Sequence, residues 1–190
     1  NICGMQSDLS CCLSPEVQRA LHRAGIQHYG CVPVHGIQFA AEFRAACAMN
    51  RCGKYGTNWT CPPAVGDFSH GVERIKAFAY GLVVQTIWTL ADSFDIEGML
   101  ASGEAHNQRV REAYQHVEPL LNGPTRLFSA GACSVCARCT YLDQQPCPFP
   151  ERAVAPLEGY GIDVTHLVEL AGLRYNNGPN TVSYVGMILF

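Results

Sequence analysis

The stretch YGLVVQTIWTL occupies residues 80–90 and is the best strand candidate in the chain. It is dense in valine, isoleucine and tryptophan, residue types that favour extended structure. Polar residues do not alternate regularly with apolar ones, as they would on a strand with one face in water. The stretch therefore predicts a central strand that is covered on both faces.

A long helical pattern and a second strand follow this stretch. Asp92, Ser93 and Asp95 provide capping residues, and the helix should end before the Asn-Gly-Pro turn at 122–124. One face of this helix should carry Met99, His106, Val110, Ala113, Tyr114, Val117 and Leu121. Residues 125–129 then predict a short strand, and strand, helix and strand together predict a parallel βαβ unit. His106 and His116 are expected at the surface, or hydrogen-bonded at the edge of the core.

The remaining pattern predicts further elements on both sides of this unit. Helices are expected after Ser14-Pro15, at about 40–49, at 68–76, at 151–157 and after Asp163, with His166 exposed. Strands are expected within 30–39, at an edge because of Pro33, and at 181–190. The fold class is therefore α/β: a single domain over residues 1–190, with a small mixed sheet, flanking helices and cysteine-rich loops at its edge. Residues 1–13 are expected to form a loose N-terminal segment.

Composition excludes several classes of protein. Hydrophobic residues make up 48% of the chain and charged residues 15%, which indicates a compact globular protein. The net charge of −3 gives no basic footprint, so nucleic acid is not an expected partner. The longest apolar run, residues 77–91, is interrupted and shorter than the ~20 residues that span a bilayer, so no membrane is expected. Eleven cysteines, an odd number, without a secretory signal argue against a disulfide framework and favour the reducing cytoplasm.

Four of these cysteines lie in one loop, at residues 131–148. Cys133, Cys136 and Cys139 are three residues apart, and Cys147 follows after a gap of seven residues, with a proline behind it. The pattern is close to the bacterial ferredoxin run C-x2-C-x2-C-x3-C-P, which binds [4Fe–4S] clusters. The longer fourth gap would let Cys147 return to the same centre. The spacing therefore predicts one fully ligated [4Fe–4S] cluster.

Zinc remains an alternative for the same four thiols. Its usual pattern is two separated C-x2-C pairs, whereas three of the four cysteines are consecutive here, which favours a cluster. With zinc the protein would be a structural or partner-docking module without catalysis. A third alternative is a non-redox cluster enzyme that catalyses desulfuration or dehydration.

A second group of cysteines lies in and before a glycine-rich loop. Cys47, Cys52 and Cys61 can converge, because Gly53 and Gly56 allow sharp turns. Three ligands leave one position open for substrate, water or a fourth residue. The candidates for that position are Cys31, Cys12, His35, His70 and Asp67.

Three motifs together resemble a known family. They are CGKYGTNWTCPP at 52–63, the run of Cys133, Cys136, Cys139 and Cys147-Pro148, and EGYGIDV at 158–164. The chain resembles small prokaryotic proteins known only as predicted metal-binding proteins of unknown function. The resemblance covers most of the chain after about residue 30, and it implies a metal site without specifying a reaction.

The expected function is an iron–sulfur protein of anaerobic metabolism. The four-cysteine cluster would transfer electrons, and a second cluster at Cys47, Cys52 and Cys61 would keep an open iron. A small molecule could be reduced there, which would make the protein an oxidoreductase. An electron-donor or electron-acceptor protein is the expected partner.

Overall fold

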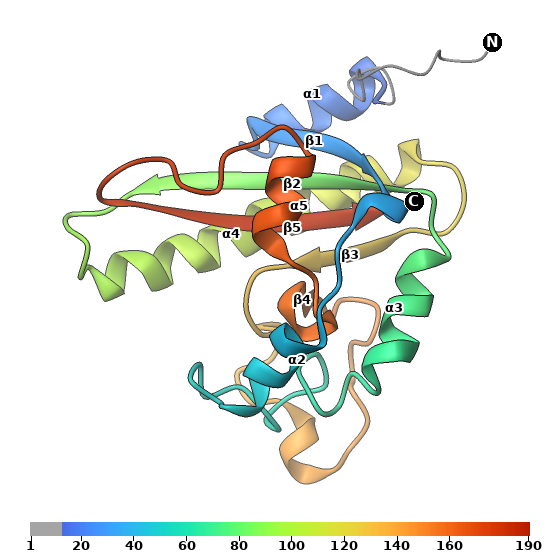
Figure 1. Cartoon of the computed structure of the whole chain (residues 1–190), viewed down its shortest axis with the longest axis vertical. Coiled ribbons are helices and arrows are strands. Elements are labelled where there is room, and N and C mark those ends of the chain that lie inside the picture. The colour runs from blue at the N-terminus through green and yellow to red at the C-terminus, as the bar shows by residue number, and fades with distance from the viewer. Residues whose placement is uncertain (1–12) are drawn as a thin grey trace.

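The predicted strand at residues 80–90 is the centre of the sheet. In the computed structural model, which describes residues 13–190, β2 lies between β1 and β5, and residues 81–86 are all buried. The strand order is β1-β2-β5-β3-β4 (Figure 1). The strands are β1 His28–Pro33, β2 Tyr80–Thr89, β3 Arg126–Ser129, β4 Ala155–Pro156 and β5 Thr181–Leu189. The prediction of an α/β fold with a mixed sheet is confirmed.

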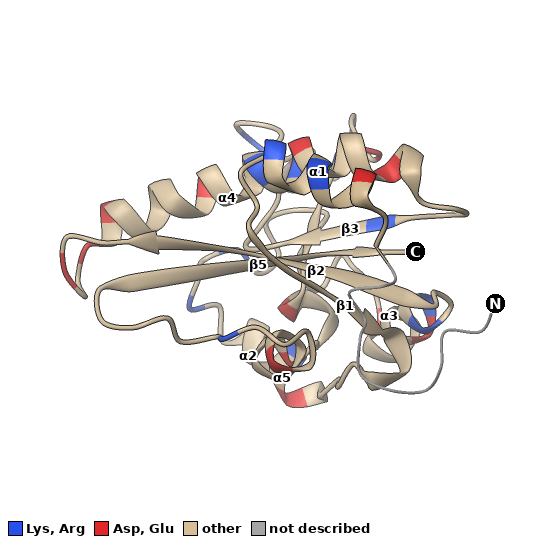
Figure 2. Ribbon diagram, turned by 90° about the horizontal axis from the view of Figure 1, so that it is seen from above, with Lys and Arg blue, Asp and Glu red and all other residues tan. Residues whose placement is uncertain are grey.

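Helices cover both faces of this sheet (Figure 2). The α-helices are α1 Pro15–Arg23, α2 Ala41–Ala48, α3 Phe68–Lys76, α4 Ile96–Val117 and α5 Val164–Leu170. Short 3-10 turns are η2 Val34–Gly36, η3 Glu118–Leu120, η4 Thr140–Asp143 and η5 Glu158–Tyr160. Successive residues of β2 face opposite sides: Leu82 packs in the core with α1 and α4, and Val83 packs in the core with α3, α5 and η5. None of the helices in residues 13–190 is long and apolar enough to cross a membrane.

The two strands of the predicted βαβ unit run parallel, as expected, but they do not pair with each other. β2 and β3 are joined by α4, and both pair antiparallel with β5, which lies between them. They therefore run parallel without touching, as in a split βαβ arrangement. The last strand of the chain supplies the missing neighbour, and a local sequence pattern carries no signal for that long-range insertion.

Three local predictions are wrong. Residues 151–157 are not helical: Ala155 and Pro156 pair with β3 as the edge strand β4, where a proline is tolerated. His106 is completely buried on α4, because its position on the apolar face points it at the sheet. His166 is half-buried instead of exposed.

Several other predictions are confirmed. Ser14 accepts a hydrogen bond from the backbone of Val17, and Asp163 caps α5 through the backbone of His166. β1 is an edge strand that ends at Pro33, and His116 is exposed. The expected loose segment at 1–13, together with Cys12, falls almost entirely outside the described residues.

Candidate metal centre

The loop that follows β3 brings four cysteines to one cavity. Cys133, Cys136, Cys139 and Cys147 all line one small pocket of about 20 Å³. The other lining residues are Trp59, Thr60, Val135, Thr140, Pro148, Phe149 and Ala153. This lining contains no imidazole or carboxylate, so sulfur is the only side-chain donor for a soft metal. Cys147 lines the same pocket as the other three cysteines.

The seven residues between Cys139 and Cys147 form an ordered turn that makes this arrangement possible. η4 starts directly after Cys139, and Gln144 adopts the left-handed conformation with φ of 53°. The backbone N–H of Gln145 donates to the Thr140 carbonyl at 3.0 Å, and the Thr140 hydroxyl donates to the Pro146 carbonyl at 3.1 Å. The long gap is therefore a compact excursion that reverses the chain.

The glycine-rich loop packs directly against this cysteine loop. The backbone N–H of Cys133 donates to the Thr60 hydroxyl at 3.1 Å. The indole nitrogen of Trp59 donates to the Gln145 carbonyl at 3.0 Å, and its ring meets Tyr141 edge to face at 5.0 Å. Trp59 thus packs over the four-cysteine cavity, whose lining it joins.

A buried asparagine organises the glycine-rich loop from within. The side-chain oxygen of Asn58 accepts from the Thr60 backbone at 3.0 Å and from the Thr60 hydroxyl at 2.8 Å. Its amide nitrogen donates to the Lys54 carbonyl at 3.2 Å. Gly53 and Gly56 have positive φ, 70° and 66°, as the sharp turns require. Asn58 and Thr60 were not singled out from the sequence, although a polar pair between two cysteines of a tight loop is a usable signal.

The second cysteine group is also gathered, but more loosely. Cys47 is half-buried near the end of α2, Cys52 is exposed, and Cys61 is buried. Burial raises the pKa of the Cys61 thiol, a hydrogen bond from Asn58 lowers it in part, and the nearby Cys52 and Cys47 raise it further. Because its raised pKa keeps the Cys61 thiol protonated at neutral pH, binding a metal there must displace its proton.

Two further charged residues belong to the surroundings of Cys47. Burial raises the pKa of Cys47, Arg44 lowers it, and Cys52 and Glu158 raise it. Arg44 donates to the carbonyls of Gly159 and Gly66, the latter at 2.6 Å. Glu158 keeps solvent-accessible surface, but neighbouring protein atoms desolvate its carboxyl and raise its pKa. Sequence reasoning missed Arg44 and did not assign a role to Glu158, although the glutamate begins one of the three motifs.

The residues suggested for the open position do not gather there. Cys31 is buried in the core formed with α1 and α4, and His35 lines a separate surface depression with Lys76 and Tyr80. His70 and Asp67 are exposed at the start of α3. In the part of the chain from residue 13 onward, no three or more His, Cys, Asp and Glu side chains form a ready metal cage. The loops therefore bring the cysteines of each group near one another, but in the described residues the thiols of neither group converge on one point.

Comparison with known proteins gives one match. A family model described as "Predicted metal-binding protein (DUF2284)" matches residues 30–190. This range contains both cysteine groups and every strand except the first two residues of β1. No curated protein gave a significant match, and no solved structure did.

Proposed function

We propose a function from the premise that the chain belongs to the predicted metal-binding protein family DUF2284: it is an iron–sulfur protein whose main centre is held by Cys133, Cys136, Cys139 and Cys147. The observation that carries this proposal is the single cavity that all four cysteines line, with no imidazole or carboxylate in its lining. Four thiolates are the usual ligand set of a [4Fe–4S] cluster, which supplies one-electron transfer when bound.

The residues around the cavity suit such a centre. Phe149, Pro148 and Val135 give it an apolar wall, and Trp59 covers it from the neighbouring loop. Exclusion of water and fixed hydrogen bonds near the ligands are the protein's means of setting a reduction potential. Because the four thiols do not form a closed cage as they stand, loading requires them to turn inward. A redox protein partner is part of this proposal.

A single zinc ion is the second candidate, and one observation favours it. A cavity of about 20 Å³ holds roughly one water molecule or one ion, so a cubane would need the loop to open. Zinc bound by four cysteines would be structural and would tie the cysteine loop together. The two candidates use the same ligands and differ in whether the centre contains sulfide and can be reduced.

For the second group we propose a centre that is less completely ligated. Cys52 helps to raise the pKa of both Cys47 and Cys61, so the three thiols lie near one another. Three thiolates would leave one coordination position for a small molecule. Glu158, whose charge is felt at Cys47, is added to the candidates for the fourth ligand. We therefore include in the proposal the reduction of a small molecule at this open position.

The test is the content of iron, acid-labile sulfide and zinc in protein purified and reconstituted without oxygen. About eight irons and eight sulfides per chain would support two clusters, and about four of each would leave the second group without one. Zinc without sulfide would overturn the iron–sulfur proposal in favour of the structural one. Reversible reduction of the absorption band near ~400 nm would support electron transfer.

Single cysteine substitutions test which residues bind each metal centre. Cys139→Ala should remove the main centre, and Cys61→Ala should remove only the second. Cys31→Ala is the matched control, because Cys31 is a buried thiol in the core with α1 and α4. Unchanged metal content in Cys139→Ala would remove this residue from the ligand set.

A further inference from the structure

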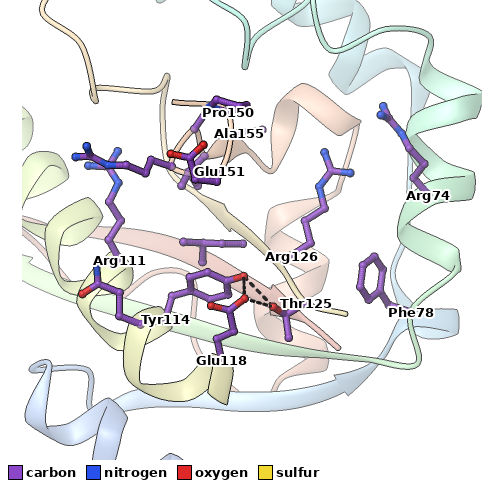
Figure 3. A pocket seen from close by; sticks show the side chains of 15 residues that line it. Arg74, Phe78, Arg111, Tyr114, Glu118, Thr125, Arg126, Pro150, Glu151 and Ala155 are labelled. Carbon is purple, nitrogen blue, oxygen red and sulfur yellow. Dashed lines mark hydrogen bonds between the residues drawn. The ribbon is translucent and has the colours of Figure 1, made fainter. Parts of the chain in front are cut away.

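A large cleft beside the cysteine loop is lined by four arginines. It has a volume of about 830 Å³ and lies between α3, α4, β3 and the segment that leads into β4 (Figure 3). The arginines are Arg74, Arg111, Arg126 and Arg152. We propose that this cleft binds a small organic anion, a carboxylate or a phosphate ester, next to the four-cysteine site. The proposal goes beyond the metal centres and does not depend on which metal they hold.

The positive charge of the cleft is not compensated by ion pairs. In residues 13–190 the ion pairs are Arg19–Glu16 and Arg138–Asp143, and neither involves an arginine of the cleft. Four guanidinium groups with two carboxylates in one lining stand out in a chain of net charge −3. An anion is the ligand that such a concentration of charge attracts.

Within residues 13–190, the two acids of the lining form no ion pair with these arginines. Glu118 accepts hydrogen bonds from the hydroxyls of Tyr114 and Thr125, at 3.0 and 3.1 Å (Figure 3). Its carboxylate is therefore engaged by these two hydroxyls and not by an arginine. Glu151 is exposed. The Nε of Arg111 is buried and lacks a hydrogen-bond partner, which is costly for a charged group unless a ligand satisfies it.

Two of the arginines are held in place by the protein. Arg126 lies over the rings of Phe128 and Tyr160, at 5.1 and 5.0 Å, and donates to the Tyr160 hydroxyl at 2.5 Å. Arg74 donates to the Val65 carbonyl at 3.1 Å. Each guanidinium has five N–H donors, so these contacts fix the groups and leave donors for a ligand. Planar guanidinium forks suit carboxylate and phosphate groups.

The shape of the cleft indicates an organic anion rather than an inorganic one. The volume lies in the range of small-molecule sites, and Phe78, Leu127, Pro150 and Val154 supply apolar surface in the lining. In Figure 3, Arg111 and Arg74 extend from opposite walls, with Arg126 between them. A molecule with an anionic group and a carbon skeleton fits both parts of this lining.

The cleft continues to the cysteine site. An adjoining cavity of about 540 Å³ shares Arg74, Arg126 and Ala155 with the arginine cleft. The same adjoining cavity shares Trp59, Thr60 and Cys147 with the four-cysteine cavity. A ligand held by the arginines would therefore lie in a space that reaches Cys147.

Isothermal titration of the metal-loaded protein tests the proposal, with succinate and glucose 6-phosphate as probes and glucose as the uncharged control. We expect saturable binding of at least one anion, none of glucose, and weakening at high salt. Tighter binding of succinate would assign a carboxylate ligand, and tighter binding of glucose 6-phosphate a phosphate ester. Failure of both anions to bind would overturn the proposal.

Substitutions locate the site. Arg126→Gln and Arg152→Gln should each weaken binding about tenfold or more, and Arg23→Gln, an exposed arginine of α1 outside the cleft, should not. Arg152 is exposed, so its variant tests the cleft even if Arg126→Gln fails to fold. Affinity equal to wild type in Arg152→Gln and in folded Arg126→Gln would overturn the assignment. Metal content, measured on the same samples, keeps this result separate from the proposed metal centres.

Discussion

The backbone N–H of Cys133 donates a hydrogen bond of 3.1 Å to the hydroxyl of Thr60, across 73 residues of sequence. The Thr60 hydroxyl in turn donates to the buried side-chain oxygen of Asn58 at 2.8 Å. One hydroxyl therefore links the first cysteine of the four-cysteine loop to the interior of the glycine-rich loop. This pair of hydrogen bonds joins the loops that carry the two cysteine groups, although the groups lie far apart in the chain.

Replacing this hydroxyl should weaken both loops. Thr60→Val keeps the shape of the side chain but removes the acceptor for Cys133 and the donor to Asn58, which should lower the free energy of unfolding by about 2 kcal/mol. Faster transfer of metal to a chelator is expected from the four-cysteine site. Thr60→Ser keeps the hydroxyl and should stay close to wild type. Equal unfolding and metal release in Thr60→Val and wild type would show that the bond contributes nothing.

Gly161 allows the residue before α2 to pack closely against the turn before α5. Its φ is +71°, and a Cβ there would lie 2.5 Å from Phe68 Cε2 and 2.9 Å from the Ala40 carbonyl oxygen. Its own carbonyl accepts from the Ala40 backbone at 2.8 Å. Gly161→Ala should therefore lower the free energy of unfolding by about 2–4 kcal/mol, measured by chemical denaturation, and displace the helix that carries Cys47.

Substitution of a second glycine distinguishes the steric clash of an added Cβ from the strain of a positive φ. Gly172 has a similar φ of +73°, but nothing lies within 4 Å of the position of its Cβ. Gly172→Ala should cost only about 1 kcal/mol, the strain of a left-handed alanine. If the two variants were equally destabilised, the contacts with Phe68 and Ala40 would not be the cause.

Much of the fold could be predicted because it is encoded locally. The β-forming run of β2 and the caps at Ser14 and Asp163 act through neighbouring residues, so a short window contains the whole signal. The place of β5 between β2 and β3 depends on pairing across about a hundred residues. Residues 151–157 were expected to be helical, and their pairing with β3 overrode that local preference.

The candidate site also has a part that could be predicted from the sequence and a part that could not. Cysteine spacing predicted a shared centre for Cys133, Cys136, Cys139 and Cys147, and the four do line one cavity. The support from Thr60 could not be predicted, because it joins two distant loops. The arginine cleft also draws its charge from separate elements, with Arg74 on α3 and Arg111 on α4.

Arg138 lies between Cys136 and Cys139 in the four-cysteine loop, close to where a metal centre would sit. The structure pairs it with Asp143, at 2.8 and 3.1 Å, with both side chains more than half exposed, 59% and 58%. Arg138→Gln should therefore change the free energy of unfolding by no more than about 0.5 kcal/mol and leave metal content unchanged. Asp143→Asn should behave alike. Loss of metal in Arg138→Gln alone would show that its charge acts on the centre directly.

His106 is the buried ionisable group of α4. Its Nδ1 lies 2.8 Å from the Thr86 hydroxyl, while its Nε2 has no partner of ordinary hydrogen-bond geometry. Burial lowers the pKa of His106 from 6.5 to about 4; the nearby Val185 backbone opposes this shift, and the charge of Arg109 adds to it. The folded protein therefore holds this ring neutral where an unfolded chain would protonate it.

Stability should consequently fall as the pH is lowered from about 6.5 to about 4. In that window the unfolded chain binds a proton at His106 that the folded protein does not, and the full loss is about 3 kcal/mol. Below about pH 4 both states are protonated and this contribution becomes constant. Urea denaturation at a series of pH values measures the slope. His106→Asn should flatten it, and His116→Asn, an exposed histidine on the same helix, should not. The same slope in both variants would assign the pH dependence to other groups.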